Sequence, residues 1–103
     1  MLDWALEALE QANGETRASL ERDRRLQLAL MHVLATVGEA ASKVTAKCRR
    51  ANPQIPWAKI VGMRNRLIHN YREVVLQVVW DTVVADIPHL ISELQRILED
   101  EYH

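Results

Sequence analysis

The sequence predicts an all-α fold, an up-down bundle of four to five helices in one domain over residues 1–103. Apolar residues recur at helical spacing through most of the chain. The three glycines and three prolines leave little material for the many tight turns of a β fold. The apolar run 74–80 resembles a strand locally, but no partner strand is evident elsewhere, so we expect a helix there too.

The first helix is expected from Leu2 to about Asn13, and Gly14 suits the left-handed residue that follows a helix C-terminus. A long second helix is expected to begin at an N-cap, Thr16 or Ser19, and to run to about Cys48. Its apolar stripe consists of Leu26, Leu30, Val33, Val37, Ala40, Ala41 and Val44.

The third helix is expected from Pro56, a favourable first-turn residue, to His69 or Asn70. Its apolar stripe reads Trp57, Ile60, Val61, Arg64 and Ile68. Arg64 therefore occupies a position where a core residue would be expected.

The last helical stretch is expected over about 74–100, where apolar residues recur alternately four and three apart. Such a seam is typical of a helix that packs against other helices. Pro88 lies inside this stretch and is expected to kink or split the helix there, because proline lacks a backbone N–H and its ring clashes with the preceding turn.

Composition narrows the possible functions. With 13 basic and 14 acidic side chains the net charge is −1, so any nucleic-acid contact must come from a local patch. A single cysteine, Cys48, cannot form an internal disulfide, which fits a cytoplasmic location. We expect no signal peptide, no membrane span and no cofactor, because the chain has no basic leader, no long apolar run and no glycine-rich phosphate loop. The four histidines are scattered, so no metal site is expected.

The segment Arg64–Tyr71 brings a guanidinium, an imidazole and a phenol together within eight residues. Asn65 and His69 are four apart and share one helix face. Arg64 lies roughly 140° around an ideal helix from His69 and about 7.5 Å along it, so one helix brings the two together only loosely. A symmetric dimer with this helix at the two-fold axis would concentrate two arginines and two histidines in one cleft.

An imidazole and a guanidinium without a metal suit transesterification of RNA. His69 would take the proton of a ribose 2′-OH or give one to the leaving 5′-oxygen, and Arg64 would bind the phosphate. Asn65 would orient the histidine or hydrogen-bond the phosphate, and Arg66 and Arg72 would add positive charge nearby. DNA lacks the 2′-OH and is excluded as a substrate.

The string Pro53–Tyr71, with its complete Arg-x-x-x-x-His-x-Tyr motif, resembles the signature of HepT-like toxins of the HEPN ribonuclease superfamily. Gly38–Ala41 upstream, and Val79-Trp80 with Asp86–Pro88 downstream, are similar to that family as well, so the resemblance covers nearly the whole chain. It implies a HEPN-like helical bundle that forms a homodimer and acts as a metal-independent endoribonuclease. Such proteins are toxins of type II toxin–antitoxin pairs.

In that family the antitoxin is an MntA-like nucleotidyltransferase that adds AMP to a tyrosine. Carried over to this chain, the resemblance implies that Arg64 and His69 are catalytic, that Asn65 supports them, and that Tyr71 is the residue modified. Each added phosphate would bring negative charge and bulk to the place where the RNA backbone must lie. Val75 departs from the family, which often has an acid near that position, and the connection between the first two helices is short.

Other interpretations remain open at this point. His69 at a helix C-terminus could serve only as a cation that the helix dipole favours, and Arg64 could extend its charged end to water. The near-neutral charge also fits a non-catalytic helical dimer that binds a nucleotidyltransferase partner or a nucleotide. A purely structural dimer is the third alternative.

Overall fold

Helices account for the regular structure in the described part of the chain. The computed structural model describes the backbone of residues 1–69 and 76–102 and the side chains of 1–68 and 76–99. Its elements are α1 (Leu2–Ala12), α2 (Arg17–Arg22), α3 (Arg24–Ser42), α4 (Ala46–Ala51), α5 (Trp57–His69), α6 (Leu76–Asp81), the π-helical segment η2 (Thr82–Asp86) and α7 (Ile87–Tyr102). No strand occurs in these residues, so the all-α prediction is confirmed. None of the helices described is long and apolar enough to cross a membrane.

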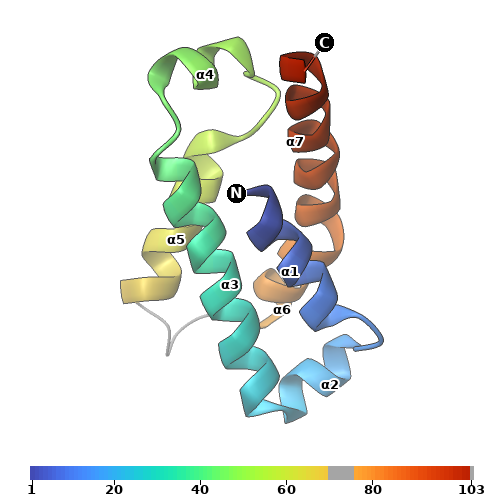
Figure 1. The fold of residues 1–103 in the computed structure, drawn as a ribbon. Helices are drawn as coiled ribbons and strands as arrows, with labels where there is room; N and C mark the ends of the chain where they lie inside the picture. The colour runs from blue at the N-terminus through green and yellow to red at the C-terminus, as the bar shows by residue number, and fades with distance from the viewer. Residues whose placement is uncertain (70–75, 103) are drawn as a thin grey trace.

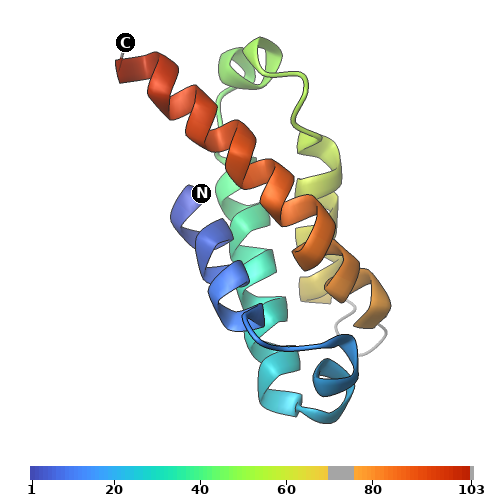
Figure 2. The same cartoon turned by 90° about the vertical axis from the view of Figure 1, so that its right-hand side faces the viewer.

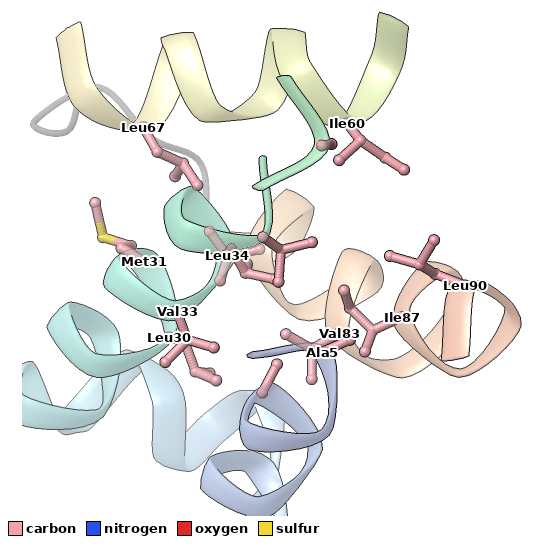
Figure 3. Close-up of a cluster of buried hydrophobic side chains, with 14 of the residues drawn as sticks. Ala5, Leu30, Met31, Val33, Leu34, Ile60, Leu67, Val83, Ile87 and Leu90 are labelled. Carbon is pink, nitrogen blue, oxygen red and sulfur yellow. The ribbon is translucent and has the colours of Figure 1, made fainter. Parts of the chain in front are cut away.

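Helix α3 runs through the middle of the molecule, with α1 on one side and α5 on the other (Figure 1). Helix α7 packs against α1 (Figure 2). Helix α5 makes its main contacts with α3. Side chains from α1, α3, α5, η2 and α7 meet in one apolar cluster (Figure 3). Its most deeply buried large members are Leu20, Leu30, Leu34, Val37, Ile55, Val83 and Ile87, and burying each such side chain contributes roughly 1.5–3 kcal/mol.

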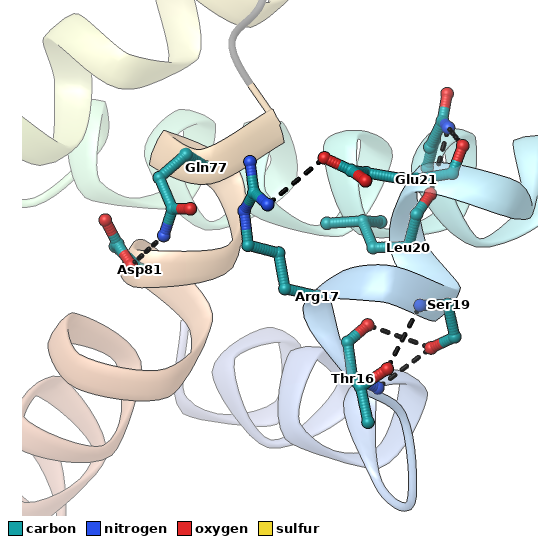
Figure 4. Close-up of polar contacts among 8 residues, drawn as sticks. Thr16, Arg17, Ser19, Leu20, Glu21, Gln77 and Asp81 are labelled. Carbon is teal, nitrogen blue, oxygen red and sulfur yellow. Dashed lines mark hydrogen bonds and ion pairs between the residues drawn. The ribbon is translucent and has the colours of Figure 1, made fainter.

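The expected long helix from Thr16 or Ser19 to Cys48 is wrong, because the chain divides it into α2, α3 and α4. Thr16 does cap α2, and it exchanges hydrogen bonds with Ser19 (Figure 4). Asp23 then ends that helix and starts the next, since its carboxylate accepts a hydrogen bond from the Leu26 N–H at 3.1 Å. Short polar side chains such as these compete with the helix for backbone groups, so they break an otherwise periodic apolar pattern.

A second break lies between α3 and α4. Thr45 caps α4 through a 3.1 Å hydrogen bond from the Cys48 N–H. Arg49 reaches back from α4 and donates to the carbonyls of Ala41 and Ser42, both at 3.0 Å. It therefore supplies a donor to the Ser42 carbonyl at the end of α3, and a further donor to the Ala41 carbonyl, which also accepts from the Val44 N–H at 3.2 Å.

The predicted limits of the third helix are close to those of α5, which begins at Trp57 directly after Pro56. The Trp57 indole N–H donates to the Asn52 carbonyl at 3.0 Å and ties the connecting loop to the helix. The sequence assigned Ile68 to the buried stripe, but Ile68 is 46% exposed and Leu67 is buried in its place.

The expected deformation near Pro88 occurs one turn before it, as a π-helical segment rather than a break. The Ile87 N–H donates to the Thr82 carbonyl, five residues earlier, where an α-helix would use the residue four earlier. The wider turn makes room for the proline ring, which would clash with the carbonyl of Val84 in a regular helix. The run that resembled a strand is α6 from residue 76 onward, and residues 74 and 75 lie outside the described part.

Candidate active site

Arg64 is held in place at both ends of its guanidinium group. Its Nη2 atom lies 2.8 Å from Oε2 of Glu39 on α3, and its Nη1 donates to Oδ1 of Asn65 at 2.9 Å. The Nε atom is buried and has no hydrogen-bond partner within the described part of the chain. The side chain as a whole is 31% exposed, so the charged end still reaches solvent.

A close approach of two helices places Glu39 beside Arg64. A Cβ atom added to Gly38 would lie 2.3 Å from the Cβ of Arg64 and 2.9 Å from the Ile60 carbonyl oxygen. Both distances are too short for any side chain, so only glycine fits at this point of α3. Because Gly38 lets α3 and α5 touch, the carboxylate of the next residue reaches the guanidinium.

Arg64 therefore occupies the inner face of α5 without being a core residue. Its neighbours on that face, Ile60 and Leu67, are 8% and 7% exposed. The arginine lies between them in sequence, and its Cβ and Cγ pack on Gly38. Its aliphatic stem thus takes the place of an apolar side chain while the charged end extends outward.

Glu39 contacts Arg64 but lies outside the Arg-x-x-x-x-His-x-Tyr motif. It follows Gly38 in residues 33–41 of α3, a stretch whose other polar residue is Thr36. An acid next to the apolar stripe of one helix and a base within the apolar stripe of another are a signal for an ion pair between two helices. Which two helices would pair could not be read from the sequence.

The other predicted site residues are distributed differently. Asn65 is exposed and contacts the guanidinium of Arg64. Arg66 lines a separate cavity on another face of α5. His69 is the last residue of α5, and its side chain is outside the described part, as are all of Tyr71 and Arg72.

The cavity that Arg66 lines has a volume of about 220 Å³ and lies between α5 and the η2–α7 segment. Its lining includes the apolar side chains of Ile60, Met63 and Leu90. Lys59 and Asp86 also line it and form an exposed ion pair, with Nζ and Oδ2 3.2 Å apart. Among the described residues, no group of three or more His, Cys, Asp or Glu side chains is placed to hold a metal ion.

Most of the chain is similar to known proteins of one family. The family model described as ribonuclease HepT-like matches residues 2–97. A protein of Thermococcus cleftensis named probable ribonuclease HepT is 36% identical over 75 residues, which are 73% of this chain and 68% of that protein. No solved structure matches the chain.

Two further relatives carry provisional RNase names. One, from Caldanaerobacter subterraneus subsp. tengcongensis, is 31% identical over 93 residues, covering 90% of this chain and 83% of its own length. The other, from Methanocaldococcus jannaschii, is 30% identical over 88 residues, covering 85% and 73% respectively.

Proposed function

Because the chain belongs to the ribonuclease HepT-like family, we propose that it is a metal-independent endoribonuclease whose catalytic groups are Arg64 and His69. The observation that carries the proposal is the fixed guanidinium of Arg64, which begins an intact Arg-x-x-x-x-His motif in the second half of α5. A cation that is both anchored and partly exposed is suited to binding a phosphate from solvent.

The proposed reaction is an internal transesterification. The ribose 2′-oxygen attacks the adjacent phosphorus, the 2′ proton passes to an imidazole, and the bond from phosphorus to the 5′-oxygen breaks as that oxygen takes up a proton. The products are a 2′,3′-cyclic phosphate and a 5′-hydroxyl. Arg64 stabilises the negative charge that develops on the non-bridging phosphate oxygens. Arg66 and Arg72 add positive charge along the path of the RNA backbone.

A homodimer supports this chemistry better than one chain. Along a single helix the motif separates Arg64 from His69 by roughly 140° of rotation, whereas a two-fold axis at α5 would bring two copies of each into one cleft. Ile68, one turn after Arg64, is 46% exposed, and this large apolar side chain beside the site is suited to burial against a second copy.

As a toxin of a type II toxin–antitoxin pair, the protein would be neutralised by an MntA-like nucleotidyltransferase that adds AMP to Tyr71. The phenol is two residues beyond His69 in the sequence. Each AMP would carry a negative phosphate to the site and repel the RNA backbone. Intact mass of protein co-expressed with the nucleotidyltransferase should show AMP additions that vanish in Tyr71→Phe. Additions that persist in that variant would move the modification elsewhere.

Digestion of total RNA by the purified protein in EDTA tests the ribonuclease proposal. Wild-type protein should yield fragments with 2′,3′-cyclic phosphate and 5′-hydroxyl ends, while His69→Ala and Arg64→Ala should yield none and should no longer arrest growth. All three proteins should keep the same helical far-UV spectrum. Equal cleavage by His69→Ala would refute the assignment. The absence of products from folded wild-type protein would favour the non-catalytic dimer that binds a nucleotidyltransferase or a nucleotide.

A further inference from the structure

The contact between Glu39 and Arg64 joins the motif helix to a helix outside it. Nη2 of Arg64 lies 2.8 Å from Oε2 of Glu39, and the carboxylate comes from α3 rather than from a neighbouring turn of α5. The two side chains are 31% and 43% exposed. Ion pairs this exposed contribute little to the stability of a fold, so stability alone is a weak reason for the pair.

The contact does define where the guanidinium points. An arginine side chain has many rotamers, and an exposed one samples them freely. Here Glu39 holds Nη2 from one side, Asn65 holds Nη1 from the other, and the stem packs on Gly38. The ion pair with Glu39 and the hydrogen bond to Asn65 restrain the two terminal nitrogens separately, and so limit how far the guanidinium can turn. Each terminal nitrogen carries two hydrogens, and the hydrogen bond to Asn65 uses one of these four.

We propose that Glu39 is a positioning residue for the ribonuclease reaction, holding the guanidinium of Arg64 so that its remaining terminal N–H groups meet the phosphate as charge develops on it. This proposal rests on the proposed function of the site. Glu39 does not touch the RNA in this scheme. Its carboxylate acts only through Arg64, and Gly38 provides the close approach that brings it within reach.

The alternative is that Glu39 restrains the site by occupying Arg64 until RNA displaces it. The two ideas predict opposite kinetics. A positioning residue raises kcat, because an orientation set in advance lowers the cost of reaching the transition state. A competing carboxylate lowers the affinity for RNA, and its removal would increase turnover at low RNA concentration. The hydrogen bond from Arg64 to Asn65 favours positioning. A carboxylate that RNA displaces would not need a second contact on the other terminal nitrogen of Arg64.

The test compares Glu39→Gln with the wild type and with two matched variants. Glu39→Asp keeps the charge on a shorter side chain and should recover part of the activity. Glu21→Gln removes a carboxylate from another exposed ion pair, 3.1 Å from Arg17, and should leave activity unchanged. Glu39→Gln is expected to lower kcat roughly 10- to 100-fold, the scale of a misplaced catalytic group. Its affinity for an uncleavable 2′-O-methyl RNA should be unchanged or a few-fold tighter, since a negative charge beside the phosphate is lost.

Several outcomes would overturn the proposal. An unchanged kcat in Glu39→Gln would remove the positioning role, and a higher kcat/KM would establish restraint instead. A fall in RNA affinity with kcat intact would make Glu39 a binding residue. A kcat loss in Glu21→Gln equal to that in Glu39→Gln would show that the loss comes from a change in surface charge and not from the contact with Arg64.

A measurement without RNA separates failure of this inference from failure of the proposed function. In NMR spectra of the arginine Nε–H groups, with the Arg64 signal assigned by its loss in Arg64→Lys, Glu39→Gln should speed rotation of the guanidinium. If the wild type cuts no RNA, the proposed function fails, and the NMR comparison still decides whether Glu39 holds Arg64. A guanidinium that rotates equally fast in both proteins would overturn the positioning role whatever the activity.

Discussion

Helix α5 has two sides that are packed in opposite ways. Toward α3 the helices touch, and the space beside Gly38 is too small for a single added carbon. Toward η2 and α7 a cavity of about 220 Å³ remains, lined by Lys59, Met63 and Arg66. Each side presents an arginine, only two residues apart, but contacts on the tight side fix Arg64 at both ends. Under the proposed function, the fixed guanidinium of Arg64 is suited to catalysis, whereas Arg66 beside the cavity would only add charge for binding RNA.

The largest expected effect distinguishes the two arginines. Arg64→Lys should lower RNA cleavage by about 100-fold or more, because a lysine cannot span Glu39 and Asn65 while also reaching a phosphate, and loss of one charge-stabilising donor costs on that scale. Arg66→Lys keeps a positive charge on the side of α5 that faces the cavity. Cleavage should change less than about threefold, because a lysine can replace an arginine where a phosphate contact needs only the charge. Initial rates on one defined RNA measure both. Equal losses would show that packing does not separate the two sides.

A pair of glycine variants tests the packing itself. Gly38→Ala introduces a carbon where there is no room, and overpacking of this kind costs about 1–3 kcal/mol of unfolding free energy. Gly62→Ala adds the same carbon on α5 with no heavy atom within 4 Å, and should stabilise the helix by about 0.5–1 kcal/mol. Thermal denaturation should therefore shift in opposite directions for the two variants. A Gly38→Ala protein as stable as the wild type would contradict the close approach of α3 and α5.

A smaller effect is expected from the ion pair on the cavity side. Lys59→Met removes the contact with Asp86 between two exposed side chains, and such pairs contribute about 0–1 kcal/mol. The midpoint of thermal unfolding should change little, and less than in Gly38→Ala. A loss of stability as large as that in Gly38→Ala would mean that α5 is also tightly packed on the side facing α7.

The smallest effect concerns Glu93, which ties the loop before α5 to α7. Hydrogen bonds from Arg96 and Gln54 lower the pKa of its carboxyl below the ordinary value. A lowered pKa in the folded state adds stability above the pKa of the unfolded chain, about 4.3, and this contribution is lost as the pH falls through the folded-state pKa. The difference in melting temperature between wild type and Glu93→Gln should be greatest above about pH 5 and shrink toward pH 3. A difference that widens with falling pH would have the wrong sign.

Predictions from the sequence are confirmed where local features of the chain decide the structure. The limits of α5 agree with prediction because they depend on neighbours in the chain, an apolar period and a proline at the first turn. The all-α class follows for the same reason. The long second helix failed where Asp23 and Thr45 cap new helices inside an apolar pattern that otherwise continues. Both residues are recognisable as caps, but the pattern alone does not tell which capping residue will break a helix.

The sequence by itself determined that the chain is helical and that α5 carries a guanidinium and an imidazole five residues apart, since periodicity, capping and motif spacing are local properties. Only the tertiary structure decided that Arg64 contacts Glu39 and Asn65, that Leu67 rather than Ile68 is buried, and that Glu39 on α3 lies beside the motif helix. Those outcomes depend on how closely α3 and α5 approach one another at Gly38. The distance between the two helices arises from packing between segments far apart in the chain, so no local sequence pattern predicts it.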